Sequence, residues 1–84
     1  MLTEYIDAAM RHAKYEIFSE DNSYYGEIEE CNGVWANEAT LEECRDDLRS
    51  ALEDWLLFSI SKQLPIPIID GIELAIHEVE EELV

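Results

Sequence analysis

The chain has 84 residues, of which 48% are hydrophobic and 31% are charged. This length makes one domain, and the apolar fraction is high enough to build a core, which excludes a wholly disordered chain. Five Lys and Arg against 21 Asp and Glu give a formal charge of −16. Affinity for nucleic acid comes largely from basic side chains, so this charge argues against direct nucleic-acid binding and favours a basic protein partner. The alternative is that the acidic side chains only keep the surface solvated.

The cysteine and histidine content also narrows the class of protein. Two cysteines, Cys31 and Cys44, are too few for a disulfide framework, and the sequence shows no signal peptide and no apolar span that could cross a membrane. We therefore expect a cytoplasmic protein with reduced thiols and no membrane contact. His12, His77 and the cysteines lack the close spacing of a metal site, so we predict no metal and no cofactor.

The first half of the chain predicts a helix followed by a β-meander. Residues 1–13 place apolar side chains at helical spacing, as in a short amphipathic helix. Residues 14–37 alternate in polarity, and their connections are too short for crossovers, which indicates three antiparallel strands. We expect these strands over residues 14–19, 24–30 and 34–36. Asn32-Gly33 predicts a tight hairpin between the last two.

The second half predicts one long helix over residues 41–64, which Pro65 stops. It begins at a capping box, in which the Thr40 hydroxyl accepts from the Glu43 amide and the Glu43 carboxylate reaches back to the Thr40 amide. One stripe of this helix should lie on the sheet: Leu41, Cys44, Leu48, Leu52, Trp55 and Ile60. The sheet face beneath it should carry Tyr15, Ile17, Tyr24, Ile28, Val34 and Ala36.

The end of this helix is apolar on every side, because the run from Trp55 to Phe58 points in four successive directions. We predict that Trp55, Leu57 and Phe58 contact the first helix or another subunit, in a homo-oligomer (dimer or tetramer). Residues 65–84 predict an extended segment and a charged tail, and residues 72–79 fit a strand or a helix. The predicted fold is thus α+β: a three- to four-stranded antiparallel sheet with one long helix on one face and a short N-terminal helix.

The other face of the sheet gathers aromatic and acidic side chains. Phe18, Tyr25 and Trp35 share it with Glu27 and Glu29. Aromatic rings bury area in protein interfaces, and carboxylates steer a basic partner. We predict that these five residues bind a partner protein. The alternative is that the rings pack against the first helix or a second copy of the chain.

Catalysis is not expected. The serines lie in no recognisable nucleophile motif. A metal-dependent nuclease would need clustered carboxylates together with basic groups to hold phosphate. The sequence is rich in the first and poor in the second, so we predict that the protein is not an enzyme and has no catalytic residues.

The order and spacing of these segments resemble the HicB antitoxin family, in particular its short, UPF0150-type members with a partial RNase H-like fold. The resemblance covers residues 15 to about 70. It rests on Tyr24-Tyr25-Gly26-Glu27-Ile28, Gly33-Val34-Trp35-Ala36, Thr40-Leu41-Glu42-Glu43-Cys44 and Leu48 to Leu52. Cys31-Asn32-Gly33 departs from the Leu-Pro-Gly turn that is common in the family.

The resemblance implies a single HicB-like domain over residues 1–84. It also implies a function: the antitoxin of a type II toxin–antitoxin pair, which neutralises a small basic HicA-type mRNA interferase by direct steric binding. The alternative function is a stand-alone homo-oligomeric scaffold, or a small-ligand-binding module, without a toxin partner.

Overall fold

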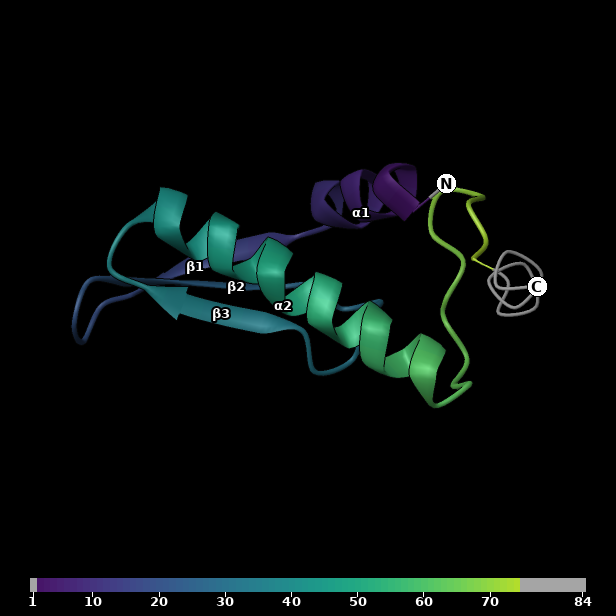
Figure 1. Cartoon of the computed structure of the whole chain (residues 1–84). Helices are drawn as coiled ribbons and strands as arrows, with labels where there is room; N and C mark the ends of the chain where they lie inside the picture. The colour runs from purple at the N-terminus through teal and green to yellow at the C-terminus, as the bar shows by residue number, and fades with distance from the viewer. Residues whose placement is uncertain (1, 75–84) are drawn as a thin grey trace.

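Residues 2–74, which this computed structural model describes, form two helices and one antiparallel sheet (Figure 1). The elements, in chain order, are α1 (Leu2–Arg11), β1 (Lys14–Phe18), β2 (Ser23–Glu27), β3 (Trp35–Glu38) and α2 (Leu41–Ser61). Within the described residues the sheet has three strands in the order β1-β2-β3. The predicted α+β class is confirmed, with the long helix on one face of the sheet and the short helix before it.

The register of the sheet decides which side chains share a face. Tyr15 lies opposite Gly26, and Gly26 in turn lies opposite Ala36. Directly opposite residues in an antiparallel sheet point to the same side, and neighbours along a strand point to opposite sides. The α2 side therefore carries Tyr15, Gly26 and Ala36, while Tyr25 and Trp35 belong to the other side.

The start of α2 is fixed by its capping residue. The Thr40 hydroxyl accepts a hydrogen bond from the Glu43 backbone amide (3.1 Å) and donates one to the Glu43 carboxylate (3.0 Å). The Glu43 carboxylate therefore accepts from the Thr40 hydroxyl, whereas the sequence predicted that it would accept from the Thr40 backbone amide. The helix ends at Ser61, a few residues before the predicted end, because Gln63 adopts a positive φ of 57° that no helix can continue through.

The buried stripe of α2 differs from the predicted one. Leu56 replaces its neighbour Trp55, which is only partly buried, and Leu41 at the helix start is exposed. The side chains of α2 that are buried are Cys44, Leu48, Leu52, Leu56 and Ser59. The stripe is rotated because α2 packs mainly on β3 and β2 and leaves most of β1 uncovered.

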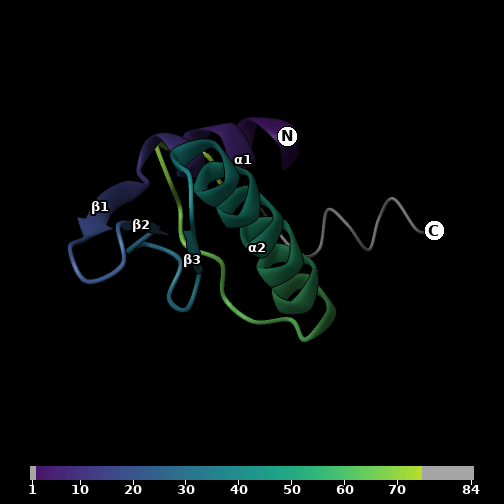
Figure 2. The ribbon, with the colours of Figure 1, turned by 90° about the vertical axis from the view of Figure 1, so that its left-hand side faces the viewer.

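Strand β1 lies at the side of the sheet furthest from α2, as Figure 2 shows. All five of its residues are exposed. The prediction that Ile17 lies beneath the long helix is therefore wrong, because Ile17 keeps 60% of its surface exposed. The Tyr15 ring leans across β2, where it covers the open side of Gly26, and lies beside Leu41 and Arg45 at the start of α2.

The connection between β2 and β3 is longer than the predicted tight hairpin. It runs over residues 28–34, and it is held by backbone hydrogen bonds between Ile28 and Val34 (3.2 Å), Cys31 and Ile28 (3.1 Å), and Val34 and Cys31 (3.0 Å). Of Asn32 and Gly33, only Gly33 has a positive φ, at 94°. Ile28, Cys31 and Val34 are all buried, so burial of apolar side chains draws this loop into the core instead of leaving a minimal turn.

Side chains in and just after α1 contact both the loop over residues 28–34 and the segment after α2. The buried Tyr5 donates a hydrogen bond from its hydroxyl to the Pro67 carbonyl (2.6 Å). Just past α1, the His12 ring lies between the Glu30 carboxylate at Nδ1 and the Asp70 carboxylate at Nε2, both at 2.8 Å. The chain after α2 thus passes alongside α1 rather than leaving the domain.

The segment after α2 contains only an isolated bridge between Ile69 and Ile72 among its described residues. Asp70 and Gly71, between them, both have positive φ, and they form a turn. The choice between strand and helix over residues 72–79 falls mostly on residues 75–79, which lie outside the described residues.

Candidate docking face of the sheet

The helix-free side of the sheet carries a stack of three aromatic rings, one from each strand. Phe18 and Tyr25 stack with centroids 5.3 Å apart and planes inclined by 17°. Tyr25 and Trp35 stack at 6.1 Å and 20°. The rings run diagonally across the strands, because Tyr25 lies opposite Glu16 on β1 and opposite Asn37 on β3. We call these three residues the aromatic ladder.

The aromatic ladder is open to solvent. Trp35 is 56% exposed and Phe18 38% exposed, although Tyr25 between them is half-buried. Stacking at these separations favours a fixed ring orientation and leaves ring surface free. The ladder therefore presents a preformed apolar and aromatic surface that needs little ordering when something binds to it.

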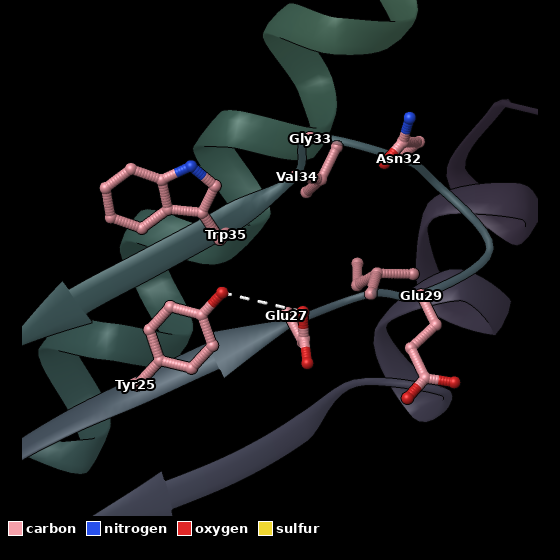
Figure 3. A pocket seen from close by; sticks show the side chains of 8 residues that line it. Tyr25, Glu27, Glu29, Asn32, Gly33, Val34 and Trp35 are labelled. Atoms are coloured by element: carbon pink, nitrogen blue, oxygen red, sulfur yellow. Dashed lines mark hydrogen bonds between the residues drawn. The ribbon is translucent and has the colours of Figure 1, made fainter. Parts of the chain in front are cut away.

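Carboxylates border the aromatic ladder. Glu27 lies opposite Trp35, and its carboxylate accepts a long hydrogen bond of 3.5 Å from the Tyr25 hydroxyl (Figure 3). Burial, and secondarily the negative charge of Glu27, raise the pKa of Tyr25. Glu29 lies just beyond β2 and forms an exposed ion pair with Lys14 (3.0 Å). An exposed pair of this kind is worth little and exchanges readily for another cation.

A shallow hollow of about 380 Å³ lies beside the aromatic ladder, seen from close by in Figure 3. Tyr25 and Trp35 form one wall, Glu27 and Glu29 line it further along, and the loop at Asn32 bounds it. Aromatic faces and carboxylates together suit an organic cation, above all a guanidinium, which stacks on a ring and pairs with a carboxylate at the same time.

All five residues predicted to bind a partner, Phe18, Tyr25, Glu27, Glu29 and Trp35, thus border this one face. Sequence reasoning missed the contribution of the 28–34 loop, because a tight hairpin would have left no loop to line a hollow. It also missed Asn37, which alternation from Trp35 would have placed on the same face. Asn37 donates to the Ser23 hydroxyl (2.9 Å) and to the Tyr24 carbonyl (2.8 Å).

The residues predicted to contact the first helix or another subunit do not form one surface. Trp55 packs partly against the core, whereas Leu57 and Phe58 are 64% and 55% exposed. Leu57 lines a small hollow of about 110 Å³ between α2 and α1, together with Leu2 and Ile6. Leu57 therefore lies near α1, and contact of these residues with another subunit stays a prediction.

The two cysteines are buried and unpaired with one another. Burial raises the pKa of Cys31 to about 11, which keeps its thiol protonated and unreactive near neutral pH. Among residues 2–74, no group of three or more His, Cys, Asp or Glu side chains is placed to hold a metal ion. Neither described helix combines the length and the apolar character needed to cross a bilayer.

Comparison with known proteins places the chain in a family. No curated protein matches the sequence significantly. Among solved structures, the crystal structure of TTHA0281 from Thermus thermophilus is similar to it, with 45% identity, a TM-score of 0.78, and coverage of 88% of this chain and 94% of that one. The partial RNase H-like character stays a prediction. The UPF0150-like family model matches residues 4–67, from α1 to the segment after α2, and the chain therefore belongs to the UPF0150-like family, as its sequence predicted.

Proposed function

We propose that this chain is the antitoxin of a type II toxin–antitoxin pair and that it neutralises a small basic HicA-type RNA-cleaving toxin by steric binding. Membership of the UPF0150-like family and the charge of −16 support the proposal. The observation that carries it is the aromatic ladder bordered by carboxylates on the helix-free side of the sheet. Neutralisation by steric binding needs an interface and no catalytic residue.

The chemistry of this face suits the surface of an RNA-cleaving protein. Such a protein presents Lys and Arg side chains to phosphates. Glu27 and Glu29 offer oxygen acceptors to the same cations, and an arginine that pairs with either carboxylate can stack on Trp35. The antitoxin therefore competes with RNA for the toxin's basic groups, and its rings bury the area that holds the complex together.

The test begins with the genes beside this chain's own in its native genome, one of which we expect to encode a small basic protein. Expressed alone it should stop growth, and co-expression of this chain should restore growth and yield a complex in a pull-down. Trp35→Ala should weaken that complex by roughly 2 kcal/mol or more, the loss typical of a central aromatic anchor. Phe58→Ala is the matched control, because Phe58 on α2 is 55% exposed against 56% for Trp35.

The electrostatic part is tested separately. Changing Glu27 and Glu29 together to Gln should slow association and reduce its dependence on salt. The control changes Glu53 to Gln and Asp54 to Asn on the exposed side of α2, which removes the same charge elsewhere. Equal effects of the two pairs of substitutions would show that the carboxylates of this face have no special part in binding the toxin. A neighbouring protein that neither poisons the cell nor binds would leave the stand-alone scaffold as the function.

A further inference from the structure

The free edge of β1 is the part of the sheet that the fold leaves unprotected. Strand β1 pairs with β2 on one side, and nothing else in residues 2–74 pairs with its other side. Its register with β2 is regular over all five residues, without a bulge or a proline. Proteins normally guard such an edge with a bulge, a proline, a free lysine or a covering segment. Lys14, the one lysine of this strand, is already paired with Glu29.

The opposite edge of the sheet, at β3, lies against helix α2. Helix α2 packs along β3, and the Ala36 side chain on its inner face is only 6% exposed. The Ala36 carbonyl also accepts a hydrogen bond from the Cys44 thiol (3.5 Å). On β1, by contrast, Ile17 on the helix side is 60% exposed. Strand β1 thus combines an open edge with an uncovered apolar side chain on the helix side of the sheet.

We propose that two copies of this chain pair along their β1 edges, antiparallel and about a two-fold axis that passes between the two Ile17 residues. The sheet then continues from one copy into the other, and α2 of each copy lies on the same side of it. In this register Ile17 meets Ile17 of the second copy, Lys14 meets Glu20, and Glu16 meets Phe18. A strand paired with its own copy must be self-complementary in this way.

Side-chain chemistry selects this register over the next one. Centring the axis on Glu16 would set two carboxylates directly opposite each other, which is destabilising in an antiparallel pair. Centring it on Ile17 places β-branched side chains together at the axis and opposite charges, Lys14 and Glu20, at both ends. Glu20 is exposed in the turn after β1 and so is available to the second copy.

A second copy suits this edge for two reasons. Lys14 and Glu20 carry opposite charges at the two ends of the segment, and the apolar Ile17 lies midway between them. The pairing shares Phe18 with the proposed toxin site on the aromatic ladder, whereas Ile17, on the helix side of β1, belongs to the pairing alone. The two copies each carry a charge of −16, so long-range repulsion opposes pairing and salt should favour it.

The test measures the oligomeric state of the purified full chain, alone, by sedimentation velocity from micromolar to millimolar concentration at physiological salt. We expect a concentration-dependent dimer. Ile17→Lys should raise the dimer dissociation constant by at least about tenfold. Leu57→Lys is the matched control, since Leu57 is 64% exposed and receives the same charge on α2. It should leave the dimer unchanged. Circular dichroism should show both variants folded, because neither side chain lies in the core.

The register is tested by exchanging charges. Lys14→Glu alone should weaken the dimer, and Lys14→Glu combined with Glu20→Lys should restore it, because each exchanged residue then meets its exchanged partner in the second copy. A monomer at every concentration would overturn the proposal. So would a dimer that Leu57→Lys dissociates and Ile17→Lys does not, which would move the interface to α2. A monomer whose Ile17→Lys variant loses the toxin would assign the edge to the toxin instead.

Discussion

Gly26 is the residue at which the uncovered strand β1 meets the core. A Cβ at this position would lie 2.8 Å from two ring carbons of Tyr15 and 3.3 Å from the Cys44 sulfur. The Tyr15 ring shares this space with the Cys44 side chain of α2, and burial there raises the pKa of the Tyr15 hydroxyl. The absence of a side chain at Gly26 therefore allows the Tyr15 ring to lie across β2 beside the start of α2.

Gly26→Ala should destabilise the fold by about 1–3 kcal/mol, because the Tyr15 ring must lift away from β2. Urea unfolding measures this, and in a Tyr15→Leu background the cost should shrink, giving a coupling between the two positions. Gly33→Ala is the control. Gly33 has open space around it but a φ of +94°, so its cost of about 1–2 kcal/mol comes from the backbone and should not depend on Tyr15. Additive effects of Gly26→Ala and Tyr15→Leu would contradict this explanation.

The His12 side chain, just after α1, contacts one carboxylate in the loop over residues 28–34 and another in the segment after α2. Its hydrogen bond to Asp70, and the nearby Glu30 carboxylate, raise the pKa of the imidazole above its ordinary value of 6.5. The folded state thus holds the proton more tightly than the unfolded state does. Protonated His12 therefore contributes stability that is fully present below about pH 6.5 and is lost as pH rises through the raised pKa.

We expect the free energy of unfolding to fall as pH rises from the unfolded-state pKa of His12 through its folded-state pKa. His12→Gln should flatten that part of the profile, because the variant has no proton to lose there. Denaturant unfolding at a series of pH values measures it, and His77→Gln serves as the control for the other histidine. A wild-type profile that the His12→Gln variant retains unchanged would show that the bridge to Asp70 and Glu30 contributes nothing.

At the scale of elements, α2 shows which features local chemistry predicts. Its start at Thr40 follows from a capping pattern within four residues, and the sequence predicted it correctly. Its buried stripe depends on which strands lie beneath it, which no local pattern contains. The sequence therefore placed Trp55 where the structure has Leu56, and it placed Ile17 under a helix that does not reach it.

The same distinction explains the candidate docking face. Strand alternation alone brought Phe18, Tyr25 and Trp35 together, because the period of two is a local property of each strand. The loop over residues 28–34 was mistaken for a tight turn, because Asn32-Gly33 is a strong turn signal and the burial of Cys31 beneath Tyr5 depends on a helix far away in the chain.

The rotated stripe of α2 makes a prediction about stability. Leu52 is fully buried, and Leu52→Ala should cost about 2–5 kcal/mol through lost burial and a residual cavity. Leu57→Ala, later on the exposed side of the same helix, should stay within about 0.5 kcal/mol. Thermal or urea unfolding distinguishes the two variants. Comparable losses at both positions would mean that Leu57 is covered in solution, and would favour the α2 interface over the β1 edge.

At the scale of the whole molecule, the net charge acts in opposite directions on the two proposed associations. Two copies at −16 repel one another, whereas a basic toxin is attracted. Raising sodium chloride from low to high concentration should therefore tighten the pairing of two copies and weaken the complex with the toxin. Sedimentation of the chain alone, and of its mixture with the toxin, gives both trends in one salt series. Parallel trends would mean that net charge governs neither association.

The contacts of α1 also set an order of events during synthesis. The sheet and α2 occupy one continuous stretch, over residues 14–61, and their pairings are between near neighbours in sequence. Tyr5 and His12, however, find their partners at Pro67 and Asp70, 62 and 58 residues further along. Contacts between distant residues form late, because closing a long loop costs entropy before any contact repays it. Helix α1 precedes the sheet in the chain, yet the bonds from Tyr5 and His12 close only after the sheet and α2 have been made.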